Sequence, residues 1–289
     1  MKKITFLSIF AFLALAALFT YQYFTFHDGK LHVVFCDVGQ GDGILITTPS
    51  HKQIIVDAGP DKKILDCLSQ YMPFWDRTID IALLTHPHAD HFAGYYYVID
   101  RYRLDQFATE ELRNNTDGFE ELEKRLQKRQ LQPHFVAAGD RWRTPDGILI
   151  EVAGPAKAFL ASKDPDGIIT SSAESASLVI KISYGDFSVL LTGDAPLDQM
   201  QMIAAEGVDG LDVLQIPHHG SSTGLDEHVL SFLKPQVSII SVGKNNYGHP
   251  KQEVLELLQK QGINVLRTDQ RGDIELVSDG KEWKIISTD

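Results

Sequence analysis

The first apolar stretch of the chain is long and unbroken, whereas every later one is short. Residues 4–26 form an uncharged run rich in Phe, Leu and Ala. At about 1.5 Å per residue, a helix of this length crosses a hydrocarbon core of about 30 Å. The run has neither a polar face nor capping residues, which argues against a buried core helix. We therefore predict a transmembrane helix within residues 1–27, in contact with the lipid bilayer through residues 4–26.

Charged and aromatic residues at the two ends of this run predict its orientation. Lys2 and Lys3 favour the cytoplasm for the amino end, which places residues 28–289 outside the cytoplasm in a single-pass protein of the cell membrane. A cleaved signal peptide, which would make the body a secreted protein, is the alternative. The run is long for a signal peptide, and Tyr21–Phe24 resembles an interfacial aromatic belt.

From Leu31 onward, short β-branched runs alternate with helical patterns, and no low-complexity linker divides them. We therefore expect a single domain over residues 28–289, in which two sheets pack together with helices outside, an α/β sandwich. The first three strands should form an antiparallel meander, because short turns join them. The expected strands are 31–36, 43–48, 53–57, 79–84, 177–183, 187–192, 212–216, 236–242, 263–267, 273–277 and 282–287. The expected helices are 61–71, one beginning near His91, 118–130, one after Pro196, one starting near Leu225, and 251–261.

Composition excludes several classes of protein. With 43% hydrophobic and 23% charged residues, the 289-residue chain is an ordinary folded protein and not a disordered or collagen-like one. The formal net charge of −12 opposes long-range capture of nucleic acid, so any phosphate site must be local. Cys36 and Cys67 exclude a disulfide framework and a four-thiolate zinc site. They form either one disulfide, if the body is outside the cytoplasm, or two buried thiols.

The segment Thr85–His91 carries the sharpest chemical signal, because it follows directly on the apolar strand 79–84. In extended backbone, side chains two residues apart emerge on the same side, as do those of His86, His88 and Asp90. Two imidazoles could then face one cation, while Asp90 and His91 face a second. Imidazole with carboxylate suits zinc, manganese or iron.

Two further strand ends carry similar residues. Asp194 follows the apolar run 189–191 and is placed either to bridge two cations or to cap the helix after Pro196. His218 and His219 follow the run 213–216. Only one of two neighbouring side chains normally faces a given site, so one is a candidate ligand and the other a contact to ligands or substrate.

Two aspartates at earlier strand ends are candidates for supporting roles. Asp57 could orient a ligand imidazole, and either it or Asp37 could instead cap a turn. Asp42, a third candidate for a contact to ligands or substrate, lies in the Gly-rich stretch 39–43. There Ile44 stands in place of the third glycine of a dinucleotide-binding motif, and a strand follows. The sequence therefore excludes dinucleotide binding there.

Together these motifs resemble the metallo-β-lactamase fold superfamily, and within it the hydrolase-like domain of ComEC-type competence proteins. The resemblance covers about residue 31 to the carboxyl end. It depends on six motifs in order: Asp37–Asp42, Val56–Gly59, Thr85–His91, Leu191–Asp194, Pro217–Ser221 and Tyr247–Pro250. The resemblance implies an αββα sandwich with two divalent metal ions, zinc or manganese, at one edge.

The same resemblance implies which residues of this chain bind each metal ion. His86 and His88 correspond to ligands of the first metal and Asp90 and His91 to ligands of the second. Asp194 corresponds to the bridging carboxylate, and His219, or less well His218, to the last histidine ligand.

The chain departs from the family in two places. Many members carry another ligand histidine within the stretch that corresponds to residues 172–178, and this chain has none there. We expect Glu174 or a water to complete the first site, or a single tightly bound ion. ComEC-type proteins also contain a multi-helix channel, whereas this chain has one predicted span, so a role in DNA translocation is not expected.

A metal pair of this kind implies hydrolysis by a water that the cations activate. Asp90 could accept the proton of that water, and His249 could contact substrate oxygen or protonate the leaving group. Tyr247 lies beside His249 as a candidate substrate contact. Ser221 and Ser222 could bind substrate phosphate or cap the helix near Leu225.

Three functions fit these residues. The first is a membrane-tethered extracytoplasmic phosphodiesterase or nuclease, with DNA among its candidate substrates and Lys244, Lys251 or Arg271 offsetting the acidic surface. The second is a hydrolase of a small phosphodiester, ester or lactone. The third is a non-catalytic envelope binding protein with the same fold. A basic strip beside the metal edge would favour the first and a closed apolar pocket the second.

Overall fold

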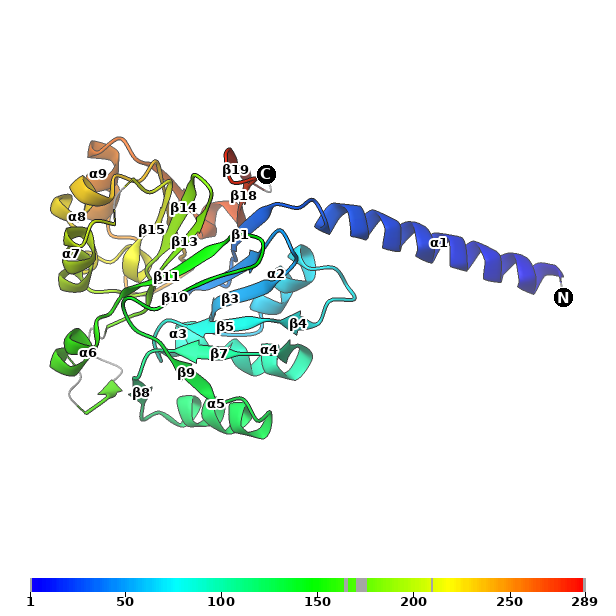
Figure 1. The fold of residues 1–289 in the computed structure, drawn as a ribbon, viewed down its shortest axis with the longest axis horizontal. Helices are drawn as coiled ribbons and strands as arrows, with labels where there is room; N and C mark the ends of the chain where they lie inside the picture. Colours follow the sequence, from blue (N-terminus) through cyan, green and yellow to red (C-terminus); the bar gives the residue numbers. More distant parts are fainter. Residues whose placement is uncertain (1, 164–165, 170–175, 209, 288–289) are drawn as a thin grey trace.

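Two β-sheets pack face to face and carry helices on both outer faces (Figure 1). The structure, a computed structural model, describes residues 2–163, 166–169, 176–208 and 210–287. Its eight-stranded sheet has the order β19-β18-β1-β2-β3-β5-β7-β9, and its seven-stranded sheet has the order β10-β11-β13-β14-β15-β16-β17. The predicted αββα sandwich is confirmed.

The eight-stranded sheet is antiparallel at one side and parallel at the other. Strands β19 to β3 pair antiparallel, and β3, β5, β7 and β9 pair parallel. Its strands are β1 (Leu31–Phe35), β2 (Gly43–Thr47), β3 (Gln53–Ala58), β5 (Ile81–Leu84), β7 (Phe107–Thr109), β9 (Pro133–Phe135), β18 (Ile274–Ser278) and β19 (Trp283–Ser287).

The seven-stranded sheet has the same mixed character, with β14 to β17 pairing parallel. Its strands are β10 (Arg141–Arg143), β11 (Leu149–Gly154), β13 (Val179–Tyr184), β14 (Phe187–Leu191), β15 (Val213–Gln215), β16 (Val237–Ile240) and β17 (Asn264–Arg267). Two small sheets pair β4 (Thr78–Ile79) with β6 (Arg103–Leu104) and β8 (Arg113–Asn114) with β12 (Ile168–Ile169).

The helices divide between the outer faces, apart from the first, which leaves the body. The helices are α1 (Lys2–Phe26), α2 (Ile64–Tyr71), α3 (Ala89–Phe92), α4 (Tyr95–Arg101), α5 (Asp117–Lys128), α6 (Lys157–Lys163), α7 (Leu197–Ala205), α8 (Glu227–Leu233), α9 (Gln252–Lys260), α10 (Thr268–Arg271) and the 3-10 turn η1 (Pro217–Gly220). Figure 1 shows α7, α8 and α9 on one side of the sheets and α2, α4 and α5 on the other.

Three apolar layers hold the sandwich together. Between the sheets, side chains such as Phe35, Ile54 and Val189 are buried together. Outside them, α2, α4 and α5 cover one sheet, and α7, α8 and α9 cover the other. Because β3 is covered on both faces, all six of its residues are buried, which fits the three consecutive apolar residues Ile54, Ile55 and Val56 at its centre.

Most expected elements occur within a few residues of their predicted bounds, and the antiparallel meander of β1, β2 and β3 is confirmed. The helix expected over 61–71 begins only at Ile64, because Asp61 instead accepts a hydrogen bond from the backbone of Lys63 in a turn. Strands β7, β9, β10 and β11 and helix α4 were not predicted. Three of these strands have three residues each, too few to show a period in the sequence.

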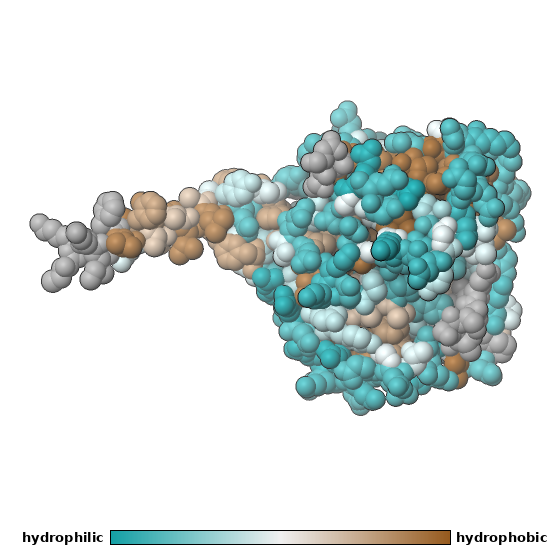
Figure 2. Space-filling view, turned by 180° about the vertical axis from the view of Figure 1, so that it is seen from behind, coloured by the Kyte–Doolittle hydropathy of each residue, from teal (hydrophilic) through white to brown (hydrophobic). Residues whose placement is uncertain are grey.

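The first helix projects away from the folded body. It spans 25 residues, and its window Leu7–Phe26 is unburied and, by length and composition, apolar enough to cross a membrane. Figure 2 shows it as a mostly brown column leaving a mostly teal body. Among the described residues it is the single helix with these properties.

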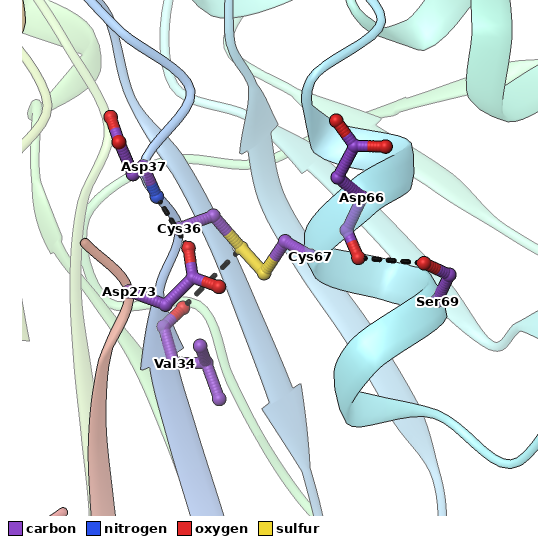
Figure 3. Close-up of a disulfide and its surroundings, with 7 residues drawn as sticks. All are labelled: Val34, Cys36, Asp37, Asp66, Cys67, Ser69 and Asp273. Carbon is purple, nitrogen blue, oxygen red and sulfur yellow. Dashed lines mark hydrogen bonds between the residues drawn. A yellow bond between two sulfur atoms is a disulfide. The ribbon is translucent and has the colours of Figure 1, made fainter. Parts of the chain in front are cut away.

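A disulfide joins Cys36, just after β1, to Cys67 in α2 (Figure 3). Both residues are almost fully buried, and their Cα atoms lie 5.8 Å apart. Of the two alternatives that the sequence left open, paired cysteines are the correct one. The link attaches α2 to the sheet at the start of the 37–42 loop.

A histidine flanked by two carboxylates lies where α1 meets the body. Nδ1 of His32 lies 2.6 Å from Glu275, and Nε2 lies 3.0 Å from Asp28. Burial alone would lower the pKa of His32, but these two hydrogen-bonded carboxylates raise it above its ordinary value. His32, Glu275 and Tyr71 line one surface hollow. Tyr71 stays neutral there, because burial and the carboxylates of Asp273 and Glu275 raise its pKa to about 12.

We expect the His32→Gln substitution to destabilise the fold in a pH-dependent way. A group whose pKa is higher in the folded state stabilises fully below its unfolded pKa, and this contribution is lost as pH rises through the folded pKa. The variant should therefore lose about 1–2 kcal/mol of unfolding free energy at pH 5.5 and much less at pH 9. Urea unfolding followed by circular dichroism measures both. His134→Gln, at an exposed position, is the control. An equal loss at both pH values would contradict the prediction.

Candidate metal centre

Strand ends from both sheets meet at one edge of the sandwich. From the eight-stranded sheet, β5 leads into Thr85, His86 and the short helix α3. From the seven-stranded sheet, β14 leads to Asp194 and β15 leads to the turn η1 with His218 and His219. Because all three are carboxyl ends of parallel strands, they come together although more than 130 residues separate the first from the last.

One group of side chains gathers around Asp194 Oδ1. His91 Nε2 lies 3.4 Å from this oxygen and His219 Nε2 lies 3.5 Å from it. His219 Nε2 also lies 3.5 Å from Asp90 Oδ2. Ligand atoms of these four residues lie within 4.8 Å of one another, close enough to hold one metal ion.

A second group gathers around the other oxygen of the same carboxylate. His86 Nε2 lies 3.6 Å from Asp194 Oδ2 and 3.0 Å from His88 Nδ1. These three residues also have ligand atoms within 4.8 Å of one another. The two groups therefore share Asp194, one carboxylate oxygen facing each.

The polar atoms between the residues of the first group lack hydrogen-bond partners. Nε2 of His91, Nε2 of His219 and Oδ1 of Asp194 are all buried in this state. Burying such atoms without hydrogen bonds costs free energy. A cation that all three atoms coordinate, at bond lengths of about 2.0–2.2 Å, would compensate for this cost. The donor set, imidazole with carboxylate, suits zinc and other divalent transition metals. These residues thus fit a metal ion by both chemistry and geometry.

Asp57 fixes the orientation of His91. Its carboxylate lies 2.8 Å from His91 Nδ1 and accepts hydrogen bonds from the backbone N–H and the hydroxyl of Thr85, at 2.8 and 2.7 Å. Since a carboxylate can only accept, Nδ1 carries the proton and Nε2 is left for a metal. Asp57 holds this position in the left-handed backbone region, at φ 56°, which is rare for a residue with a side chain.

His219 is oriented in the same manner from the second sheet. Its Nδ1 lies 2.9 Å from the backbone carbonyl of Ser241, which can only accept, so Nε2 again faces the cluster. Asp42 lies 3.5 Å from the same Nδ1 and 3.8 Å from Nδ1 of His91. Asp42 and Asp57 thus form a buried acidic layer behind the two histidines.

Gly193 is required by the close approach of the two sheets. Its φ is +49°, and a Cβ atom there would collide with the hydroxyls of Ser177 and Thr85. The glycine lets the chain turn directly after β14 and place Asp194 between the two histidine groups.

Burial and neighbouring charges shift the titration of the cluster. Burial, with His91 nearby, lowers the pKa of His86 well below its ordinary value. Burial alone would also lower the pKa of His91, but the carboxylates of Asp194 and Asp57 raise it well above that value. Burial would raise the pKa of Asp194, yet His91 and His219 hold it well below its usual range. The arrangement attracts positive charge, so protons and metal ions compete for it.

Three further ring side chains lie beside the cluster, toward the protein surface, and we call this region the rim. His218 is one-third exposed, and its Nε2 lies 3.7 Å from Asp194 Oδ2, on the side of His86. The ring of His249 lies 5.6 Å from that of His218, and the exposed ring of Tyr247 lies 5.8 Å from that of His249. Burial beside His218 and His219 lowers the pKa of His249 to about 4. These three rings form a row that leads outward from Asp194.

Several predicted alternatives are corrected. Asp37 does not join the cluster: it accepts a hydrogen bond from the backbone of Gly39 and lines a surface hollow beside Cys67, which makes it a turn residue. Asp194 caps no helix, because Pro196 occupies the N-cap position of α7. Asp226 caps α8 through the backbone N–H of Val229, so Ser221 and Ser222 do not.

Two further predicted residues have different outcomes. Ser221 is buried in the turn after His219, where its hydroxyl lies 3.1 Å from that of Thr223. Glu174, proposed to complete the first site, lies outside the described residues.

Three supporting residues were not predicted. Ser177 accepts a hydrogen bond from the backbone N–H of Asp194 and lies 3.5 Å from His86 Nδ1. Asn245 bonds the backbone of both Tyr247 and His249 and so shapes the rim loop. Thr85 anchors Asp57. Only Thr85 had a local signal, its position directly before His86.

The sequence of the chain matches the model of one protein family. Residues 36–244 match the model of the metallo-beta-lactamase superfamily, which is most of the chain. The chain belongs to this superfamily. The matched range contains every residue of the two histidine groups, whereas His249 and Tyr247 of the rim lie just beyond it.

Three curated relatives of this superfamily member are competence and recombination proteins. ComE operon protein 3 of Bacillus subtilis is 28% identical over 267 residues, covering 86% of this chain and 33% of that protein. Recombination protein 2 of Haemophilus influenzae is 29% identical over 245 residues, covering 83% and 28%. Competence protein ComA of Neisseria gonorrhoeae is 24% identical and covers 92% and 35%. The chain thus spans about a third of the length of the curated relatives it matches, and the resemblance to ComEC-type proteins is confirmed.

Solved structures share the fold at low sequence identity. The metallo-beta-lactamase fold protein YhfI from Bacillus subtilis has a TM-score of 0.57 at 13% identity and covers 86% of this chain and all of that one. Zn²⁺-bound PqqB from Methylobacterium extorquens has a TM-score of 0.53 at 14% identity, covering 86% and 99%. CmlA, a diiron β-hydroxylase from Streptomyces venezuelae, has a TM-score of 0.55 at 13% identity, covering 86% and 54%. At these identities the likeness shows the fold alone.

Proposed function

We propose that this chain is a membrane-tethered, extracytoplasmic hydrolase that uses two divalent metal ions to cleave phosphodiester bonds. The observation that carries the proposal is the sharing of one carboxylate, Asp194, between two groups of histidines, with buried nitrogen and oxygen atoms that make no hydrogen bond. A structural cluster would have its polar atoms hydrogen-bonded to one another.

The residues that would hold the metal ions follow from the two groups. His86, His88 and Asp194 would hold the first, and Asp90, His91, His219 and again Asp194 the second. Bound divalent cations supply Lewis acidity and a water acidic enough to act as nucleophile near neutral pH. Zinc and manganese both suit the ligand set.

The chain's own residues would provide proton transfer and substrate contacts. Asp90 is about one-third exposed, so its carboxylate can both join the cluster and accept a proton from water at the open side. His218 and His249 lie side by side on the rim, with their rings 5.6 Å apart, and would contact substrate oxygens there. Asp57 lies at Nδ1 of His91 and Asp42 at Nδ1 of His219, so both carboxylates hold the ligand imidazoles from behind with Nε2 facing the metal position.

Three observations support a location outside the cytoplasm. The unburied apolar helix α1 supports a membrane tether. Lys2 and Lys3 at its start favour the cytoplasmic side for the amino terminus. The disulfide between Cys36 and Cys67 is a bond that persists in oxidising compartments and is rare in the cytosol.

The relatives and the rim support a phosphodiester substrate. The relatives' names refer to competence and recombination. The exposed Lys244 and the partly exposed Lys251 flank Tyr247 in the rim loop, and Lys251 donates to the Tyr247 carbonyl. These cations would offset the formal charge of −12 close to the site. The same acidic surface favours the second candidate, a small phosphodiester, ester or lactone, because a compact substrate meets less repulsion.

Assays of the full chain in detergent micelles would separate these substrates. We expect hydrolysis of bis-p-nitrophenyl phosphate and of single-stranded DNA in the presence of Mn²⁺ or Zn²⁺. The His88→Ala, Asp90→Ala double variant should be slower by roughly 10²-fold or more, since it removes one ligand from each group. His134→Ala, at an exposed histidine far from the cluster in sequence, should match the wild type.

Each alternative has its own signature in these assays. Turnover of the small ester without cleavage of single-stranded or duplex DNA, abolished in the double variant, would leave the small-molecule hydrolase. Metal binding without turnover of any substrate would leave an envelope binding protein.

A further inference from the structure

The loop after α2 lies against the side of α1 and forms an aromatic patch with it. The rings of Phe19 and Trp75 are 4.4 Å apart, and Phe74 packs edge-on against Trp75 at 5.0 Å. The backbone N–H of Phe74 donates to the side chain of Gln22 at 3.0 Å. We call Phe19, Tyr23, Phe74 and Trp75 the aromatic collar. Tyr23 and Phe74 are each nearly half exposed, so the collar presents aromatic surface with no protein covering it.

The position of the collar along α1 places it at the bilayer surface. Phe19 lies seven residues before the end of α1, which is about 10 Å along the helix axis. A hydrocarbon core of about 30 Å takes about 20 helical residues. Counted from Ile4, the first residue after the two lysines, 20 residues end at Tyr23 of the aromatic collar. A core that begins at Ile4 therefore ends at the level of the collar, where Trp75 packs against α1. Tryptophan and tyrosine are the residues that prefer this interfacial depth.

Charge on the body cannot supply this contact. The chain carries a formal charge of −12, which repels anionic headgroups. A surface that adheres to a bilayer without cationic residues must do so with apolar and aromatic side chains, as the collar can.

The metal centre lies at the opposite edge of the body. The end of α1 meets the turn between β2 and β3, where the rings of His27 and His51 are 3.9 Å apart. From there β3 runs about 13 Å from Gln53 to Asp57, which lies directly behind the cluster. In Figure 1, β5 also runs from the side of the body where α1 leaves toward the metal edge, with β4 at its amino end and α3 at its carboxyl end.

We propose that the collar is a second bilayer contact which, with α1, holds the metal centre facing the aqueous phase. The substrate would then arrive from water, and lipids of the anchoring leaflet would be out of reach of the metal ions. This inference rests on the membrane tether of the proposed function and deepens it by naming a water-borne substrate class.

Single-tryptophan variants of the full chain in phosphatidylcholine vesicles test the proposal. The chain has three tryptophans, so Trp142→Phe with Trp283→Phe leaves Trp75 as the probe. Adding Trp75→Phe to that background allows two further probes, Phe10→Trp inside the apolar run of α1 and Tyr247→Trp on the rim of the metal edge. Lipids carrying a nitroxide near the headgroup or near the bilayer midplane quench fluorescence according to depth.

We expect Trp75 to be quenched roughly twofold by the shallow nitroxide, as an interfacial tryptophan should be. The Phe10→Trp variant should be quenched mainly by the deep nitroxide and the Tyr247→Trp variant by neither. Quenching of the Phe10→Trp variant without quenching of Trp75 would overturn the collar contact and leave the tether intact. Quenching of the Tyr247→Trp variant would overturn the orientation. An unquenched Phe10→Trp variant would overturn the tether itself. None of these readouts depends on hydrolysis, so a failed activity assay would be a separate result.

Discussion

Replacing Asp194 with alanine is expected to abolish hydrolysis and to lower the metal content of the protein. Asp194 is the single side chain that belongs to both groups, with one oxygen 3.4–3.5 Å from His91 and His219 and the other 3.6 Å from His86. Its removal takes a ligand from both proposed metal ions and the negative charge that attracts them. We expect the rate of bis-p-nitrophenyl phosphate hydrolysis to fall by about 10³-fold or more. Elemental analysis should find fewer metal ions per chain than in the wild type.

A matched substitution controls for general damage. Asp198→Ala, four residues further along the chain, removes a half-exposed carboxylate paired with Lys163 on the surface of α7. An exposed pair of this kind contributes about 0–1 kcal/mol, so this variant should keep the metal content and the rate of the wild type. Circular dichroism would verify that both variants are folded. A folded Asp194→Ala variant with full metal content and an unchanged rate would refute the two-metal centre.

Removing the disulfide is expected to cost the fold a large part of its stability. The Cys36–Cys67 bond closes a loop of 31 residues, and constraining the unfolded chain to this extent contributes about 3–4 kcal/mol in the chain-entropy account. The Cys36→Ser, Cys67→Ser double variant should lose about this much unfolding free energy. Urea titrations followed by near-ultraviolet circular dichroism, with and without dithiothreitol, would measure it.

The reductant provides the internal control for this experiment. The wild type in dithiothreitol should lose about as much stability as the double variant, and the variant itself should not respond to the reductant. If the wild type unfolds at the same urea concentration with and without dithiothreitol, the bond contributes nothing and the prediction is wrong.

The elements of the fold that were predicted are those with a clear period or a continuous apolar run. β3 has three consecutive apolar residues, 54–56, at its centre, and α5 places Phe119, Leu122 and Leu126 on one face. The strand β9 was not predicted, because its three residues include Pro133 and two exposed side chains. Such a strand exists only because β7 offers it a partner.

The candidate site shows the same division between local and distant information. His86, His88, Asp90 and His91 lie within six residues. Figure 1 shows α3, which contains Asp90 and His91, at the end of β5, where the strand pattern predicts these residues. For Asp194 the sequence fits a helix cap as well as a metal ligand, and for Asp37 it fits a ligand contact as well as a turn. Each of these choices depends on residues that lie far away in the chain.

What the sequence determined by itself is the set of elements and the chemical character of their ends. An apolar run of 23 residues at the amino terminus, short strands behind it, and imidazoles and carboxylates at three strand ends are local properties that any fold of this chain must accommodate. The tertiary structure decided which of these ends meet, which joined Asp194 to both histidine groups, paired Cys36 with Cys67 and left Asp37 outside. The physical reason is that strand ends converge through the packing of two sheets, and the burial of residues such as Phe35 and Val189 between the sheets sets that packing across the whole chain.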